Sequence, residues 1–150
     1  MKLWVLVISS MSLVNSVLSG AVDNVNLDPK CVGGALHEFR LTDCTHFPCI
    51  IKRGKEYTID ADFSSSKDIV TPNVRCGTIY LGRQVPLSGY GGCHTLSNGT
   101  CPIQAETIYS TTTSFKIPYY VPSTIYTVWC RLEDDSGQTL VCGSGSGKVV

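Results

Sequence analysis

The sequence predicts an all-β protein built as an antiparallel β-sandwich, and three observations lead to that class. Apolar residues recur at every second position in several short segments, which is the pattern of half-buried strands. Turn signals rich in glycine, aspartate and serine separate these segments. No segment keeps the 3.6-residue period of an amphipathic helix over helix length. About seven short strands joined by such turns are typical of a sandwich.

The clearest strands are expected over residues 57–63, 109–117 and 126–132, where apolar or aromatic residues alternate with polar ones. Weaker patterns predict further strands, in chain order, over 35–41, 49–52, 74–81 and from 140 onward. The last of these contains the run Gly143–Gly147. Because glycine weakens strands, we expect this one to bulge or fray.

Length and charge narrow the class of function. A chain of 150 residues suits one domain. Charged residues make up 16% of it, which is too few for charge-driven disorder. The 12 basic and 12 acidic residues give a net charge of zero, so the basic footprint of a nucleic-acid-binding protein is missing. We expect a single domain with no nucleic-acid partner.

The first 20 residues are typical of a secretory signal peptide. Lys2 precedes an apolar stretch, and small residues follow at Ser19, Gly20 and Ala21. The stretch is too short and too rich in serine for a membrane span of about 20 apolar residues. We therefore expect a cleaved signal at residues 1–20 and a mature domain at residues 21–150. The protein should be secreted or lumenal, with the lysosomal lumen as the alternative compartment.

Eight cysteines follow the predicted signal peptide: Cys31, Cys44, Cys49, Cys76, Cys93, Cys101, Cys130 and Cys142. An even number in an oxidising compartment predicts four disulfides, although the spacing leaves their pairing open. A zinc site needs closely clustered ligands, whereas the nearest pairs here are C-x₄-C and C-x₇-C. We expect no metal ion and no cofactor.

A sequon, Asn98-Gly99-Thr100, lies between the two cysteines of the C-x₇-C pair. The surrounding loop is rich in glycine, so the asparagine should be accessible. The motif predicts N-glycosylation of Asn98.

Catalytic signatures are weak. His37, His46 and His94 lie in separate segments and form no metal-binding spacing. The serines within Gly143–Gly147 stand at the wrong offsets for G-x-S-x-G, and Lys148 interrupts G-x-G-x-x-G. A triad can be assembled from distant residues, so spacing alone does not decide the matter. We expect a protein that is not an enzyme.

Two further segments have both an ordinary and a functional interpretation. The cluster Lys52–Lys55 suits a solvated hairpin turn in which Gly54 takes a positive φ, or a cationic rim for an anionic head group or lipid surface. The segment Phe115–Pro122 carries two prolines that prevent regular strand pairing, with apolar and aromatic residues around them. Such a segment exposes apolar side chains unless it lines a pocket mouth or a partner surface.

Several short motifs occur in order along nearly the whole mature chain. They are Cys31, the loop Cys44–Cys49, the segment Ile50–Lys55, Gly82 with Val85-Pro86-Leu87, Cys93, Cys101-Pro102-Ile103, Tyr109, Phe115–Pro118, Val121-Pro122, Asp134-Asp135 and Cys142. Each motif is weak alone, but the ordered set resembles the ML-domain lipid-recognition family. That family includes the soluble Niemann–Pick type C type-2 sterol-transfer proteins and the group-two mite allergens, and the mite-like layout suggests an arthropod-like member.

The resemblance implies an immunoglobulin-like two-sheet sandwich with an internal hydrophobic cavity. It also implies the pairings Cys31–Cys142, Cys44–Cys49 and Cys93–Cys101. By subtraction Cys76 pairs with Cys130, a fourth bridge that members of the family usually lack. If both cysteines face inward, the bridge spans or narrows the cavity; if they face outward, it joins neighbouring strands.

The resemblance further implies a secreted, monomeric carrier that binds a fatty acid, a sterol or another long apolar ligand, a semiochemical included. A membrane or a receptor would be its partner in ligand transfer. The residues expected at the cavity wall or mouth are Tyr57, Ile59, Phe63, Val85, Leu87, Tyr109, Phe115, Ile117 and Tyr119. Two alternatives are an innate-immune recogniser of microbial lipids that acts with a receptor, and an extracellular interaction module with a solid core.

The sequence departs from the sterol-transfer proteins at two places that bear on the ligand. Leu87 stands where those proteins carry a phenylalanine at the cavity mouth. The glycine-rich tail replaces their apolar last strand. A sterol-shaped slot therefore does not follow from the resemblance.

Overall fold

A computed structural model describes residues 22, 25–86 and 91–150. The strands in these ranges are β1 (Asn26–Leu27), β2 (Gly34–Leu41), β3 (Cys49–Ile51), β4 (Glu56–Ser65), β5 (Asn73–Tyr80), β6 (Arg83–Pro86), β7 (Tyr109–Lys116), β8 (Ile125–Glu133) and β9 (Thr139–Val149). A single 3₁₀ turn, η1 (Cys93–Thr95), is the one helical element in them. The predicted signal peptide and Leu87 lie outside the described residues.

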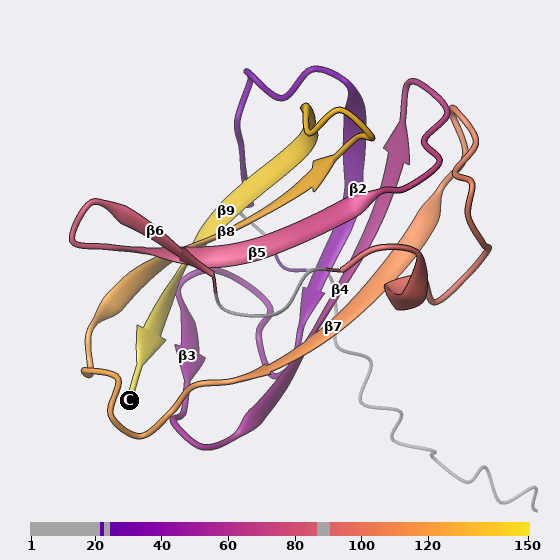
Figure 1. The fold of residues 1–150 in the computed structure, drawn as a ribbon. Helices are drawn as coiled ribbons and strands as arrows, with labels where there is room; N and C mark the ends of the chain where they lie inside the picture. Colours follow the sequence, from indigo (N-terminus) through magenta and orange to yellow (C-terminus); the bar gives the residue numbers. More distant parts are fainter. Residues whose placement is uncertain (1–21, 23–24, 87–90) are drawn as a thin grey trace, which may run out of the picture.

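The strands form two sheets that pack face to face, as Figure 1 shows. The larger sheet has the order β1-β9-β8-β5-β6. β3 also pairs with β9, closer to the C-terminal end of β9 than β1 does. The smaller sheet has the order β2-β4-β7. All pairings are antiparallel except that of β3 with β9, which is parallel. The prediction of an all-β two-sheet sandwich is confirmed.

Alternating burial explains why the smaller sheet turns one face inward. In β4, Tyr57, Ile59 and Phe63 are buried, and the residues between them are more exposed. The register with β7 sets Tyr57 opposite Phe115 and Phe63 opposite Tyr109. The first pair stacks at 5.7 Å between ring centroids, and the second lies tilted at 6.4 Å. Each pair joins the two strands through their inward side chains.

The space between the sheets is filled at one end only. At the filled end, seven buried side chains pack together: Phe63, Ile69, Ile103, Tyr109, Leu132, Leu140 and Val141. Ile69 and Ile103 are 0% exposed and exchange two backbone hydrogen bonds of 2.9 and 2.8 Å. The other end is bounded by a second apolar cluster, and its side chains surround the cavity described below.

The glycine run does not disturb the last strand, so the expectation that it makes this strand bulge or fray is wrong. The register shift in its pairing with β8 falls between the pairs Leu132–Val141 and Glu133–Thr139, before the run. β9 is continuous from Thr139 to Val149 and pairs with β8 along nearly its whole length. β1 and β3 pair with its other edge. Backbone hydrogen bonds on both edges hold the strand, and these bonds do not depend on side chains.

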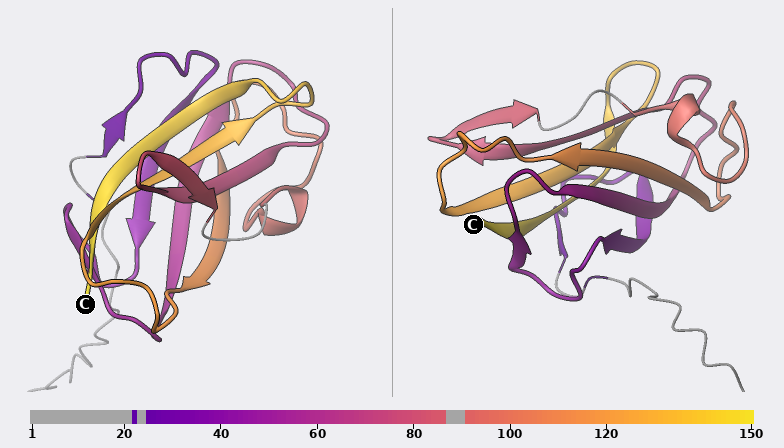
Figure 2. Two further views of the ribbon diagram at one scale, coloured as in Figure 1. Left: turned by 60° about the vertical axis from the view of Figure 1, so that its left-hand side comes forward. Right: turned by 90° about the horizontal axis from the view of Figure 1, so that it is seen from below.

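All eight cysteines are bonded in the four pairings that the resemblance implies: Cys31–Cys142, Cys44–Cys49, Cys76–Cys130 and Cys93–Cys101. Cys31–Cys142 ties the segment before β2 to β9, and Cys93–Cys101 closes the loop beside the filled end. Figure 2 shows the two layers of the sandwich from two further sides. No helix in the described ranges is long and apolar enough to cross a membrane.

Candidate functional site: an apolar cavity between the sheets

A cavity of about 520 Å³ lies between the two sheets, away from the filled end. One wall comes from β2, β4 and β7 of the smaller sheet, through Phe39, Leu41, Ile59 and Phe115. The facing wall comes from β3, β5, β8 and β9 of the larger sheet, through Cys49, Ile51, Thr78, Tyr80, Tyr126, Val128, Cys130, Gly143, Gly145, Gly147 and Val149. Most of these side chains are apolar, so the cavity favours an apolar occupant.

Two polar side chains in this wall, those of Thr78 and Tyr126, are hydrogen-bonded within the protein. The Thr78 hydroxyl donates to the Thr127 carbonyl oxygen at 2.9 Å, and the Tyr126 hydroxyl donates to the Pro122 carbonyl oxygen at 3.0 Å. Each hydroxyl hydrogen is therefore committed to a backbone acceptor. These two side chains present their apolar parts to the cavity and require no polar partner from an occupant.

The cavity reaches the surface between the β5–β6 hairpin and residues 117–122. Its lining there includes exposed residues, namely Tyr80, Val85 and Pro86 on the hairpin and Pro118, Tyr120 and Pro122 on the opposite segment. Tyr120 is 86% exposed and Val85 is 41% exposed. The sequence left open whether the segment Phe115–Pro122 lines a pocket mouth or exposes apolar side chains. In the structure, residues 117–122 form one side of the mouth and also expose aromatic side chains.

The basic cluster at residues 52–55 holds that segment in place. Gly54 has a φ of 76°, as expected for the turn, and its N–H donates to the Ile117 carbonyl at 2.8 Å. The Arg53 guanidinium donates to the Val121 carbonyl at 3.2 Å and to the Val150 carbonyl at 3.3 Å. Lys55 forms an ion pair with Asp43. The turn and the positive φ of Gly54 are confirmed, but the interpretation as a hairpin is wrong, because β3 pairs with β9 and β4 pairs with β2 and β7. The turn instead connects the two sheets, and Arg53 joins it to the mouth and to the C-terminus.

Four of the nine residues expected at the cavity, Ile59, Val85, Phe115 and Ile117, lie in its lining. That they contact a ligand stays a prediction. Leu87 is outside the described residues.

The structure corrects the other four positions. Phe63 and Tyr109 belong to the filled end, because β4 and β7 run past the cavity into the solid half of the sandwich. Tyr57 lies behind the wall: it stacks on Phe115, and its hydroxyl accepts a hydrogen bond from the Lys52 N–H at 2.8 Å. Tyr119 is 78% exposed and lies over Gly54 instead of facing inward.

The fourth disulfide combines the two alternatives that the sequence left open. Cys76 and Cys130 face each other on neighbouring strands of one sheet, with their Cα atoms 4.1 Å apart. Cys76 is buried, and Cys130 lines the cavity. The bridge therefore faces inward, yet it joins adjacent strands along the wall and does not cross between the sheets.

The glycine-rich inward face of β9 was missed as part of the site. Gly143, Gly145 and Gly147 lie opposite Cys130, Val128 and Tyr126 of β8, respectively. All three line the cavity, where they contribute backbone in place of side chains. Their spacing of two residues was the available signal, since alternate residues of a strand share a face.

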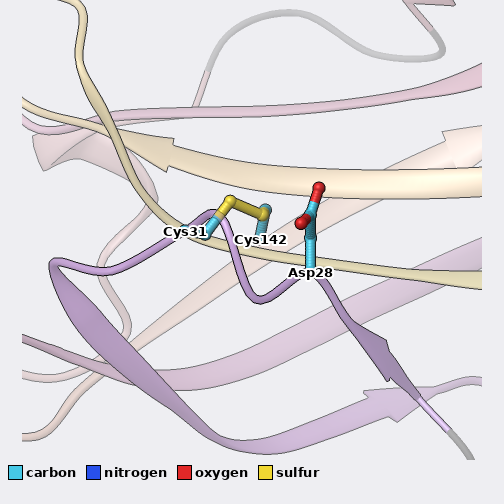
Figure 3. A group of neighbouring side chains, drawn as sticks. All are labelled: Asp28, Cys31 and Cys142. Atoms are coloured by element: carbon cyan, nitrogen blue, oxygen red, sulfur yellow. A yellow bond between two sulfur atoms is a disulfide. The ribbon is translucent and has the colours of Figure 1, made fainter.

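Two other groups of polar side chains in the described part of the chain lack what a metal or catalytic site requires. Asp28 lies beside Cys31 and Cys142, as Figure 3 shows, but both sulfurs are consumed in their disulfide and are not thiolate ligands. One Asp28 oxygen also accepts a hydrogen bond from the Lys30 N–H at 2.9 Å.

His37 and Ser64 lie 2.8 Å apart between Nε2 and Oγ, which is one contact of a nucleophile–base pair. The nearby Asp62 carboxylate is held instead by Arg40 and by the Ser110 hydroxyl, and these hydrogen bonds lower its pKa. Neither His37 nor Ser64 lines the cavity. The pair therefore lacks both the orienting acid and the adjoining pocket of a triad.

Two disulfide-bridged sheets with an apolar cavity between them define a class of small hollow β-sandwiches. Residues 20–148 match the family model described as the ML domain, and the chain belongs to this family. The resemblance in the sequence is thereby confirmed.

Two relatives illustrate the similarity in sequence. The chain is 28% identical over 111 residues to NPC intracellular cholesterol transporter 2 of Mus musculus, which covers 73% of each chain. It is 26% identical over 121 residues to mite group 2 allergen Lep d 2 of Lepidoglyphus destructor, covering 79% of this chain and 83% of the allergen.

A solved structure shows the same fold. A Niemann-Pick type C2 protein from the Japanese carpenter ant superimposes with a TM-score of 0.71 over 82% of this chain and 97% of the ant chain. The two are 16% identical, so this likeness concerns the fold alone.

Proposed function

We propose that this protein is a secreted carrier that binds a lipid, a fatty acid, a sterol or another long apolar ligand between its sheets, without chemical change to the ligand. The observation that carries the proposal is the 520 Å³ apolar cavity that opens between the β5–β6 hairpin and residues 117–122. Membership of the ML domain family and the cholesterol transporter among the relatives support it.

Partitioning provides the driving force. Each methylene group that leaves water for the cavity contributes about 0.8 kcal/mol, so a long chain or a ring system gains enough to be held without a covalent bond. A hollow core also forgoes packing contacts within the protein. Four disulfides offset this loss by restricting the unfolded chain.

Non-enzymatic binding fits the chemistry of the lining. Binding pockets of this kind use apolar walls for affinity and a few polar groups for orientation. The hydroxyls of Thr78 and Tyr126 are bonded to backbone carbonyls, so they are not poised as acids or bases. The proposed ligand range includes a semiochemical, because an apolar signalling molecule meets the same requirements.

Secretion and glycosylation belong to the same proposal. Four disulfides suit an oxidising compartment, in agreement with the predicted signal at residues 1–20. Asn98 is exposed, and its Oδ1 accepts a hydrogen bond from the Ser110 N–H at 2.5 Å. That bond leaves Nδ2, the atom to which a glycan is attached, free to react.

A second candidate, lipid recognition together with a receptor or a membrane, is favoured by the surface beside the mouth. Tyr119, Tyr120 and Ile125 are 78%, 86% and 63% exposed, and such apolar groups are typical of a partner surface. A stable complex with a receptor ectodomain would distinguish this function from simple carriage. The solid-core module is disfavoured, because a solid core leaves no cavity of this size.

Titration with a fluorescent fatty acid tests the proposal. We expect saturable binding at one site per chain and displacement of the probe by unlabelled apolar ligands. Competition with a single-chain fatty acid and with a sterol, in separate series, ranks the two ligand classes. Failure of the folded protein to bind any of them would contradict the proposal.

A further inference from the structure

The outer edge of β9 is paired by two strands. β1 pairs with this edge at Gly143 and Ser144, and β3 pairs with it from Gly147 to Val149. Among the described residues, neither strand pairs with Gly145 and Ser146, and Val25, just before β1, also lines the cavity. Side chains therefore complete the cavity wall at Gly145.

The side chain of Phe47 lies over the inward face of Gly145. A Cβ atom added to Gly145 would lie 2.2 to 2.4 Å from three carbon atoms of the Phe47 ring, so the ring rests directly on the bare backbone of β9. The Phe39 ring lies beside it, with the centroids 6.1 Å apart. Phe47 is partly buried and lines the cavity, so its ring forms part of the cavity wall over Gly145.

A disulfide and a strand pairing keep Phe47 over Gly145. It belongs to the short loop closed by the Cys44–Cys49 disulfide, and β3 begins at Cys49, immediately after Pro48. The pairing of Cys49 with Gly147 sets the loop two residues from Gly145 along β9. The loop thus presents the ring to Gly145 from a fixed anchor.

We propose that Phe47 is the end wall of the cavity and limits the length of ligand that the protein accepts, an inference that rests on the proposed function. A chain that enters at the mouth and extends toward β9 gains affinity with each methylene it buries until it meets this ring. Replacing the ring with a small side chain lengthens the cavity by the space that the ring fills. A longer chain can then extend over the backbone of Gly145.

Gly145 is required by the ring and not by its own backbone conformation. Positive φ values occur at turn glycines such as Gly54 and Gly137 but not at Gly145. Any side chain at position 145 collides with Phe47 and forces the ring to move. Phe47 and Gly145 are therefore complementary: the large ring fits because residue 145 has no side chain.

The test is a binding series with saturated fatty acids of increasing length. While each added methylene is buried, affinity should rise about fourfold per methylene, and the rise should stop at a break point in the wild-type chain. In Phe47→Ala the break point should move to longer acids, and in Phe47→Leu it should move less far. Phe63→Leu is the control, since it trims a phenylalanine of the filled end and should leave the break point unchanged.

Thermal unfolding of each variant first establishes that it is folded, and Phe47→Leu serves if Phe47→Ala is not. An unchanged break point in a folded Phe47 variant overturns the inference while the proposed function stands. Absence of binding to the wild-type chain overturns both. Unfolding also tests the contact without ligand: Gly145→Ala should destabilise the wild-type chain strongly and the Phe47→Ala chain much less.

Discussion

Cys76 and Cys130 lie directly opposite each other on β5 and β8, and their disulfide runs along the cavity wall. A bridge in this position stiffens one sheet and leaves the space between the sheets open. It explains how the protein carries a fourth disulfide on its inward face and still has a cavity of about 520 Å³.

Removing this bridge should lower stability and preserve binding. In the double variant Cys76→Ala/Cys130→Ala, the free energy of unfolding should fall by about 2–4 kcal/mol, because the bridge closes a long loop in the unfolded chain. Fatty-acid affinity should stay within a few fold of wild type. Urea unfolding and probe titration measure the two effects, with Cys93→Ala/Cys101→Ala as a control that opens a much shorter loop. Loss of binding in the folded double variant would show that the bridge shapes the site.

A charge at the mouth should weaken binding. Val85 lines the cavity at its exposed rim, so Val85→Asp is expected to fold and to reduce fatty-acid affinity by about tenfold, through the loss of apolar contact and the desolvation of a carboxylate. Gln84→Asp introduces the same charge one residue away, at a position outside the lining. Probe titration compares the two variants. Equal losses in both would mean that charge repulsion is responsible and not the cavity.

Arg53 should control how firmly the mouth is held. Arg53→Ala removes the hydrogen bonds from the guanidinium to the carbonyls of Val121 and Val150, and should lower stability by about 1–2 kcal/mol. Because residues 117–122 are then less restrained, ligand release should become faster. Stopped-flow dissociation and urea unfolding measure these effects. Lys52→Ala is the matched control, since only the backbone N–H of Lys52 donates to Tyr57, and a release rate unchanged from wild type in Arg53→Ala would contradict the role.

Asp134 should contribute to stability in a pH-dependent manner. Hydrogen bonds from Lys67, from the Ser136 hydroxyl and from the N–H groups of Ser136 and Gln138 lower the pKa of this carboxyl. The folded pKa is below the unfolded value of about 3.9, so the contribution is complete above that value and is lost as the pH falls toward the folded pKa. Asp134→Asn should therefore flatten the fall in stability on acidification.

Urea unfolding over a series of acidic pH values measures this dependence. Some slope should remain in Asp134→Asn, because hydrogen bonds also lower the pKa of Asp62 and Asp135. A slope identical to that of the wild-type chain would contradict the role of Asp134.

The strands were predictable wherever alternation reflects burial on one face. The first part of β4 and most of β7 follow this rule, and the sequence placed both strands. β1 and β6 were missed because strands of two and four residues are too short to show a period. The regularity of β9 was underestimated, because the low strand preference of glycine was considered without the backbone pairing that β9 makes on both edges.

The site was predictable only in part, because the sequence pattern does not distinguish a cavity wall from a solid core. Tyr109 and Phe115 occupy equivalent inward positions on β7, yet the first packs into the filled end and the second lines the cavity. What separates them is the presence of opposing side chains, and that depends on three-dimensional neighbours such as Leu132, Val141 and the bare Gly145. Phe47 gave no signal at all, since it lies in a loop with no period.

The central claim, that the hollow end of the sandwich holds an apolar ligand, is tested most directly by mass spectrometry of an organic extract of the natively produced protein. The account predicts a defined apolar compound that co-purifies at up to one molecule per chain and is lost on unfolding. A native protein that yields no such compound, and that binds no fatty acid or sterol once folded, would contradict it.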